Sequence, residues 1–146
     1  TLLSTSQLKT QITSIFMGDQ AESKAIQCMS FGFKYGFPAE ADLMLDVRCF
    51  PNPFSIPELK HQTGLDKPVQ DFVLGAEDTR IFLRHLYAML DHLIPLYIQE
   101  GKTQLVVAVG CTGGKHRSVT IANALAEHIR SAGHRVLINH RDIEKV

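Results

Sequence analysis

A short apolar run that ends in a glycine-rich loop is the feature that most constrains how this chain can fold. Residues 105–109 are apolar without interruption and three of them are valine, which is typical of a strand buried on both faces of a sheet. The run ends at Gly110, and from Ser118 onward apolar residues recur at the spacing of an α-helix. The loop between them therefore connects the end of a buried strand to the N-terminus of a helix.

This loop has the residues that an anion site needs. At a helix N-terminus, unpaired backbone N–H groups and the positive end of the helix dipole favour negative charge. Gly113 and Gly114 allow backbone conformations and close approaches that other residues resist. Lys115, His116 and Arg117 add positive charge or hydrogen-bond donors. We therefore expect a phosphate group to bind here.

Three interpretations of the loop compete, and the sequence excludes the first of them. A Walker A nucleotide loop does not fit, because the spacing is one residue too short and Lys115 is followed by His116 instead of Ser or Thr. Cys111 and Arg117 do have the Cys-x5-Arg-Ser spacing of cysteine-dependent phosphatases, although Gly110 stands where such enzymes usually carry histidine. A general acid for that reaction is not evident in the sequence. The third interpretation is a loop that binds phosphate without catalysis.

The composition is that of a globular domain. With 146 residues, 45% hydrophobic and 21% charged, the chain has the length of one ordinary domain. No apolar run approaches the roughly 20 residues that span a bilayer, and no signal peptide pattern is present. We therefore expect a cytoplasmic protein with no membrane partner. The three cysteines have no paired spacing, so neither a disulfide framework nor a metal site is predicted.

Charge is distributed unevenly along the chain. The formal net charge is zero, yet residues 101–146 carry seven Lys and Arg against three Asp and Glu. Four of the seven histidines lie in the same part of the chain. This local excess of positive charge favours a phosphorylated ligand, either small or polymeric.

The hydrophobic periodicity indicates alternating strands and helices. The predicted strands cover 25–33, 42–48, 105–109 and 135–139, and the predicted helices cover 1–18, 66–74, 77–99 and 118–132. Three prolines in residues 50–57 predict an irregular loop. The strand–helix–strand unit at the C-terminal end is a right-handed crossover, which requires parallel strands. The fold class is therefore α/β, a single domain with a mostly parallel sheet flanked by helices and the phosphate loop at a strand-to-helix junction.

Three charged side chains stand near the ends of the two predicted N-terminal strands. Lys34 is a candidate phosphate contact. Asp46 and Arg48 lie on the same side of their strand, because strand side chains alternate. These two residues either bind a sugar hydroxyl and a phosphate together or pair with each other.

Five sequence blocks carry a resemblance to a known family. They are SFGFKYG (30–36), DVRCFPNP (46–53), TGLDKPV (63–69), GCTGGKHRS (110–118) and HRDIEK (140–145). In this order they resemble the C-terminal domain of the RNase adapter protein RapZ and its YvcJ relatives. The resemblance covers nearly the whole chain from about Ala25.

The resemblance implies a regulatory domain. Family members join an N-terminal P-loop domain, which binds and hydrolyses ATP or GTP, to a C-terminal domain such as this one. The P-loop domain is not in this sequence, so residues 1–18 are expected to form a linker helix and residues 19–146 the ligand-binding domain, which needs no cofactor and is not expected to be an enzyme. The family domain senses glucosamine-6-phosphate, and in enteric bacteria it binds a small RNA that it presents to an RNase. It also assembles into homo-oligomers.

The residues implicated by the loop, the strand ends and the resemblance form two overlapping sets. The expected sugar-phosphate site comprises Asp46, Arg48, Thr112, Gly113, Gly114, Lys115, His116, Arg117 and Ser118. The expected RNA contacts are Lys34, Arg48, Lys60, Arg117, His140 and Arg141. One position departs from the family pattern, since Phe54 replaces a histidine of the enteric proteins and can stack on a ligand but cannot donate a hydrogen bond to phosphate. The alternatives are a cysteine-dependent phosphatase that uses Cys111 and Arg117, and a YvcJ-like ATP- or GTP-hydrolysing regulator without an RNA role.

Overall fold

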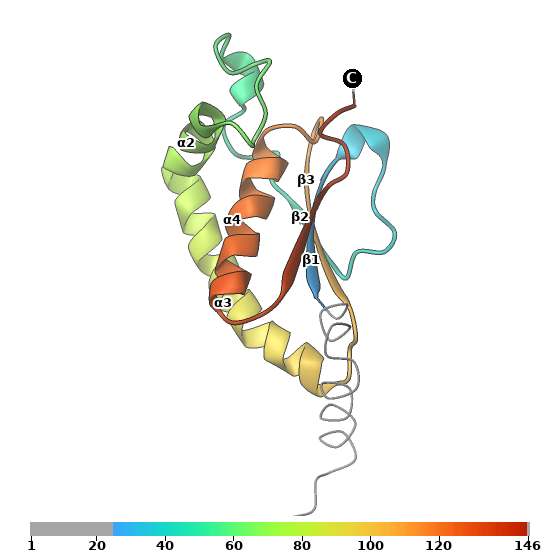
Figure 1. Ribbon diagram of the computed structural model, residues 1–146. Helices are drawn as coiled ribbons and strands as arrows, with labels where there is room; N and C mark the ends of the chain where they lie inside the picture. Colours follow the sequence, from blue (N-terminus) through green and yellow to red (C-terminus); the bar gives the residue numbers. More distant parts are fainter. Residues whose placement is uncertain (1–24, 146) are drawn as a thin grey trace, which may run out of the picture.

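A four-stranded parallel sheet forms the centre of the structure, a computed structural model that describes residues 25–145 (Figure 1). Its strands are β1 (Ile26–Gly32), β2 (Leu43–Asp46), β3 (Leu105–Cys111) and β4 (Val136–His140). They lie in the order β2-β3-β1-β4, and every pair is parallel. The expected α/β fold with a mostly parallel sheet is thus confirmed. The helix predicted over 1–18 lies outside the described residues, so the division into a linker and a domain at residue 18 stays a prediction.

The two central strands end at the same level of the sheet. β1 and β3 are in register from Ile26 opposite Leu105 to Gly32 opposite Cys111. All seven residues of β3 are buried, as its apolar sequence predicts. β3 runs two residues beyond the predicted strand 105–109, because the pairing with β1 continues to Cys111. The loop after β3 therefore begins beside the last residue of β1.

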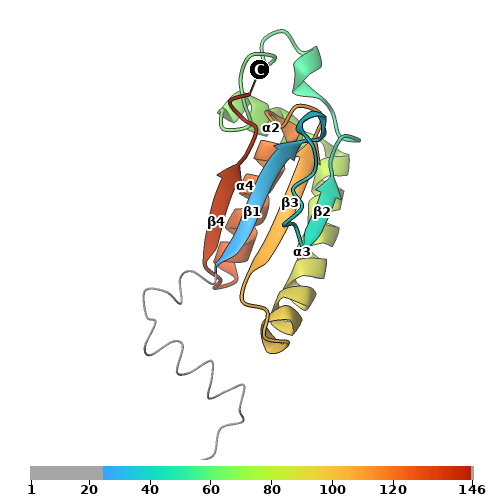
Figure 2. The ribbon, with the colours of Figure 1, turned by 90° about the vertical axis from the view of Figure 1, so that its right-hand side faces the viewer.

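Three α-helices cover one face of the sheet, as the two ribbon views show (Figures 1 and 2). They are α2 (Lys67–Gly75), α3 (Glu77–Gln99) and α4 (Arg117–Ser131), and their predicted positions are confirmed within one residue at each end. Each helix buries an apolar stripe; that of α3 comprises Leu83, Leu86, Leu90 and Ile94. These side chains pack with the helix-facing residues of the strands into one hydrophobic core.

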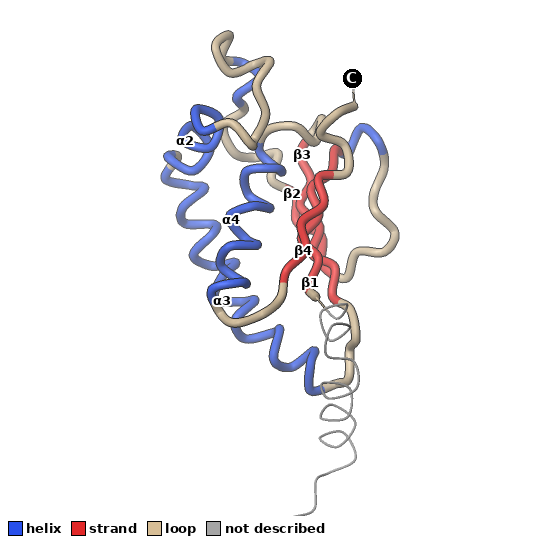
Figure 3. Tube along the Cα trace, in the orientation of Figure 1, coloured by secondary structure: helices blue, strands red, loops and turns tan. Residues whose placement is uncertain are grey.

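Several short segments gather at the carboxyl edge of the sheet, and Figure 3 shows them as loops and short helical turns. They include the turn η2 (Phe33–Tyr35) after β1, the turn η3 (Pro53–Ser55), the loop 112–116 and the residues after β4. η3 lies in the proline-rich stretch predicted to be irregular, and there the side chain of Asn52 accepts a hydrogen bond from the N–H of Phe54. Ligands of parallel α/β sheets bind at this edge. Within the described residues, no helix is both long and apolar enough to cross a membrane.

Candidate anion-binding site

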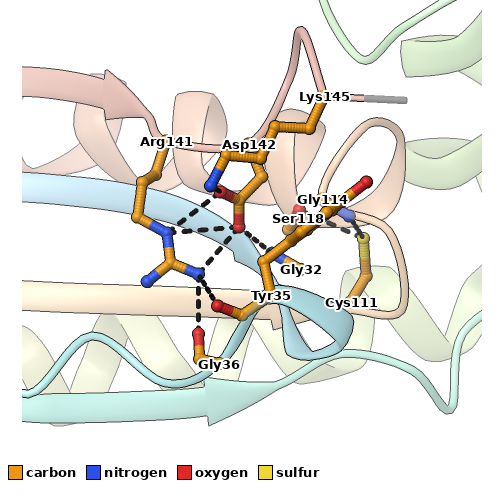
Figure 4. Close-up of polar contacts among 9 residues, drawn as sticks. All are labelled: Gly32, Tyr35, Gly36, Cys111, Gly114, Ser118, Arg141, Asp142 and Lys145. Carbon is orange, nitrogen blue, oxygen red and sulfur yellow. Dashed lines mark hydrogen bonds and ion pairs between the residues drawn. The ribbon is translucent and has the colours of Figure 1, made fainter.

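The loop after β3 is shaped by its own cysteine. The Sγ of Cys111 accepts a hydrogen bond from the N–H of Gly114 at 3.3 Å and lies 3.1 Å from the Oγ of Ser118 (Figure 4). Gly114 has φ of +77°, a left-handed conformation that glycine adopts at little cost. The loop therefore folds back over the thiol before α4 begins.

Neighbouring segments hold the loop from both sides. The N–H of Lys34 donates to the carbonyl of Thr112 at 3.2 Å, and the N–H of Gly64 donates to the carbonyl of Lys115 at 2.8 Å. A Cβ atom on Gly32 would lie only 2.5 Å from the carbonyl carbon of Gly113. The blocks around residues 32 and 64 thus carry glycine where the phosphate loop passes.

The backbone donors of the loop remain available. His116 is the N-cap of α4 and provides no side-chain cap, and the first backbone bond of the helix runs from the N–H of Thr120 to the carbonyl of His116. Within residues 25–145, no group accepts a hydrogen bond from the N–H of Thr112, Gly113, Lys115 or His116. Such a row of unpaired N–H groups at a helix N-terminus is an anion-binding arrangement.

A pocket of about 340 Å³ opens beside these donors. Its wall contains four basic side chains and one imidazole, those of Lys34, Lys115, Arg117, Lys145 and His116. None of the described residues that line it is an aspartate or glutamate; the others are Tyr35, Asn52, Phe54, Cys111, Thr112 and Gly113. The electrostatics of the pocket therefore favour a ligand with negative charge.

Two of these side chains are buried with an unused donor or acceptor. Arg117 is 5% exposed and donates through Nη1 to the carbonyls of Arg48 at 2.6 Å and Phe50 at 3.1 Å, while its Nε has no partner. His116 is 7% exposed, and its Nε2 has no partner. Because buried polar atoms are normally hydrogen-bonded, unpaired ones in side chains that line a pocket indicate a site for a polar ligand.

Burial also affects the ionisation of the histidine. It lowers the pKa of His116, and the charges of Lys115 and Arg117 lower the pKa further, while the nearby backbone of Gln62 and Lys60 opposes the shift. The imidazole is therefore held toward its neutral form.

Asp46 and Arg48 pair with each other, which is one of the two arrangements expected for them. Their side chains form two hydrogen bonds, of 2.9 and 2.7 Å, and the guanidinium lies 4.0 Å from the ring centroid of Phe33. The hydrogen bond from Arg48 lowers the pKa of Asp46. Neither side chain lines the pocket. Arg48 contacts the site only through its backbone, because its carbonyl oxygen accepts a hydrogen bond from Arg117.

The residues expected to contact RNA fall into separate places. Lys34 and Arg117 line the pocket, whereas Lys60 lies at its margin with Nζ 4.7 Å from the centroid of Phe54. His140 is half-buried, with Nδ1 2.7 Å from Ser30 Oγ. Arg141 donates to the carbonyl of Gly36 at 2.6 Å and to a neighbouring carboxylate. The structure thus brings four of the loop side chains together with Lys34 and leaves Lys60, His140 and Arg141 outside the pocket lining.

Two charged residues at the site, Lys145 and Asp142, were not predicted from the sequence. Lys145 lines the pocket, and the fully buried Asp142 lies behind its wall. Both lie in the block HRDIEK (140–145), which would have identified the segment but not the roles of its members. Tyr35 and Asn52 were likewise inside quoted blocks without being singled out.

One feature of the pocket supports the phosphatase interpretation and another opposes it. The Oγ of Ser118 lies close enough to Cys111 Sγ to hydrogen-bond with it. No aspartate or glutamate stands among the described residues that line the pocket, so no carboxylic acid is placed there to protonate a leaving group. Nor does any cluster of three or more His, Cys, Asp or Glu suited to a metal occur in the part of the chain that the structure describes.

Comparison with known proteins gives a consistent picture. Residues 24–144 match the family model described as the RapZ C-terminal domain. A nucleotide-binding protein of Limosilactobacillus fermentum is 50% identical over 145 residues, which are 99% of this chain and 50% of that protein. Another, from Clostridium novyi, is 55% identical over 141 residues, 95% of this chain and 48% of that protein. This chain thus spans about half the length of the curated relatives that it matches.

Proposed function

This chain belongs to the family of RapZ C-terminal domains, and we propose that it is a regulatory domain whose loop 111–117 binds the phosphate of a phosphorylated amino sugar such as glucosamine-6-phosphate. The observation that carries the proposal is the pocket with four basic side chains, one imidazole and no lining carboxylate among the described residues, beside the uncapped N-terminus of α4. The two buried, unpaired nitrogens of His116 and Arg117 support it further.

The pocket suggests how the two parts of such a ligand would lie. Phosphate oxygens would accept hydrogen bonds from the N–H groups of the loop and would form ion pairs with Lys115 and Arg117. The sugar ring would lie toward Tyr35 and Phe54, which supply aromatic faces, and Asn52 offers an amide for a hydroxyl group.

The names of the relatives state nucleotide binding for those proteins, and we propose that it resides in the half of them that this chain does not match. The loop of this chain differs from a Walker A loop in length and in the residue after Lys115. Hydrolysis of ATP or GTP is accordingly proposed for a separate P-loop domain, and this domain acts in the cytoplasm as its regulatory partner, within a homo-oligomer.

RNA is the proposed second partner, and an RNase the proposed recipient of that RNA. Lys34, Lys60, Lys115 and Lys145 lie at or beside one pocket, so an extended phosphate backbone could follow them. Affinity for single-stranded RNA should then fall with salt with a slope of about 0.7 per phosphate contact. Lys60→Gln should reduce this slope by about 0.7, the contribution of one phosphate contact. An affinity that does not change with salt would contradict the proposed RNA-binding surface.

The sugar-phosphate proposal is tested by calorimetric titration of glucosamine-6-phosphate into the wild type, Lys115→Gln and Arg84→Gln. Lys115→Gln should weaken binding roughly tenfold or more, because it removes a charged hydrogen bond. Arg84 is an exposed residue of α3, so its variant controls for the loss of one positive charge. No heat from the wild type, or equal affinities of the wild type and Lys115→Gln, would refute the proposal.

Arg117→Ala is a poorer probe of the same site. Its guanidinium holds the carbonyls of Arg48 and Phe50, so the substitution would also release the 48–50 segment. A loss of binding in that variant would not separate ligand contact from folding.

The contact between Ser118 and Cys111 favours one alternative function, a cysteine-dependent phosphatase. Turnover of an aryl phosphate that disappears in Cys111→Ser would support it. Equal background rates in the wild type and Cys111→Ser across pH 5 to 8 would exclude the phosphatase and leave ligand binding as the function.

A further inference from the structure

A buried carboxylate stands behind the wall of the candidate pocket, although none lines it. Asp142 is fully buried and follows β4 by two residues. It accepts hydrogen bonds or ion pairs from three directions, all visible in Figure 4. A buried charge requires several strong partners, and Asp142 has three.

The first partner ties Asp142 to the phosphate loop. Its Oδ2 accepts the N–H of Gly32 at 2.8 Å. The backbone of Gly32 packs directly on Gly113 and Gly114, so tightly that a Cβ on Gly114 would lie 2.6 Å from the nitrogen of Gly32 and 3.0 Å from the Cβ of Asp142. Asp142 and Gly32 together form the surface on which the loop turns.

The second partner ties it to the wall that carries Lys34. Arg141 donates to the carboxylate of Asp142 through Nη2 at 2.8 Å, and through the same nitrogen to the carbonyl of Gly36 at 2.6 Å. This bridge holds the end of the η2 turn, which begins directly after β1 and contains Lys34 and Tyr35.

The third partner is a cation of the pocket itself. The Nζ of Lys145 lies 2.7 Å from Oδ1 of Asp142 and 4.9 Å from the ring centroid of Tyr35. Asp142 thereby fixes the position of Lys145 at the pocket wall.

We propose that Asp142 is a positioning residue for the anion site. Its carboxylate holds the Gly113–Gly114 backbone, the η2 turn and Lys145 in their binding arrangement. This inference rests on the proposed function and extends it to a residue that does not touch the ligand. The strong hydrogen bonds at Asp142 also show in its ionisation: burial alone would raise the pKa, but Arg141, the N–H of Gly32 and Lys145 lower the pKa to about 2. The carboxylate is therefore charged throughout the neutral range.

The proposal reverses the expectation from charge alone. Removal of a negative charge near a phosphate site should tighten phosphate binding through simple electrostatics. Loss of a positioning residue should instead weaken it, on the order of tenfold, as changes behind the direct ligands of a site commonly do. The sign of the change in affinity thus decides between the two.

The test compares Asp142→Asn with Glu144→Gln in the 146-residue chain. Glu144 is an exposed carboxylate of the same segment, so its variant removes the same charge without the three contacts. With glucosamine-6-phosphate as the titrant, Asp142→Asn should bind on the order of tenfold more weakly and Glu144→Gln as tightly as the wild type or slightly more so. Equal or tighter binding by Asp142→Asn would overturn the proposal.

A second measurement separates this inference from the function on which it rests. The backbone amide signals of Gly32, Gly113 and Gly114 can be followed by NMR without ligand, in Asp142→Asn and in Asp91→Asn. Asp91 forms a hydrogen bond with His128 between two helices, so its variant controls for the loss of a carboxylate contact elsewhere. Shifts of Gly113 and Gly114 confined to Asp142→Asn support the positioning role even if the wild type binds no sugar phosphate. Unchanged glycine signals would contradict the role regardless of binding.

Discussion

At the scale of single residues, the site depends on side chains that are buried at the edge of a pocket. His116 and Arg117 combine low exposure with one unpaired nitrogen each, whereas Lys34 reaches the pocket from an exposed position. Arg117 also holds the 48–50 segment through two carbonyls. The same guanidinium therefore serves both folding and the proposed binding.

The depressed pKa of His116 predicts a pH dependence of stability. Burial lowers the pKa in the folded state, so below about pH 6.5 the unfolded chain takes up a proton more readily than the folded chain. The free energy of unfolding should therefore fall as pH decreases from about 6.5 toward the lowered pKa. Urea unfolding at several pH values should show a shallower decline for His116→Asn than for the wild type.

A matched variant completes this comparison. His85→Asn removes an exposed imidazole from α3 and controls for the loss of a histidine as such. A decline in His116→Asn as steep as that of the wild type would show that the protonation of this residue does not contribute.

At the scale of elements, the phosphate loop was the most predictable part of the chain. The buried run of β3 and the periodicity of α4 identify it by position, since both signals are local in sequence. The way in which the loop is held was not predictable, because Gly32 and Gly64 contact it across long sequence separations. The role of Asp142 was not predictable for the same reason, because its contact with Gly32 joins residues that are 110 positions apart.

Two neighbouring glycines of this loop should respond differently to substitution. Gly114→Ala should destabilise the fold by about 1 to 3 kcal/mol, because φ is +77° and the new Cβ would meet the backbone of Gly32 at 2.6 Å. Gly113→Ala should change stability by no more than about 0.5 kcal/mol, because nothing lies within 4 Å of its Cβ position. Chemical unfolding of both variants tests this, and equal losses would contradict the loop geometry.

At the scale of the whole molecule, the sequence predicted the elements and the fold class but not how every charged residue is used. The α/β class followed from strand–helix–strand order, and the structure confirms it. Asp46 and Arg48 could be assigned to one side of a strand but not to a pairing, since period-two alternation gives the side and not the rotamer. The inward contacts of His140 and Arg141 required the placement of β4 next to β1, which periodicity alone does not specify.

The lowered pKa of Asp142 predicts how the stability of the domain responds to acid. The pKa of Asp142 is lowered from 3.8 to about 2, so its contribution to stability is present above about pH 4 and is lost as pH falls through about 2. Asp142→Asn should remove this contribution and flatten the pH dependence of the urea midpoint between pH 4 and 2. A midpoint that falls as steeply in the variant as in the wild type would assign the acid sensitivity to other groups.

The central claim, that the loop 111–117 binds a phosphorylated amino sugar, is tested most directly by an NMR titration of the 146-residue chain with glucosamine-6-phosphate. The structure leaves the N–H groups of Thr112, Gly113, Lys115 and His116 without partners in the described residues, so their signals should shift the most and saturate together. No saturable shift, or shifts centred at the opposite end of the sheet around Ile94, Tyr97 and Arg135, would contradict the claim.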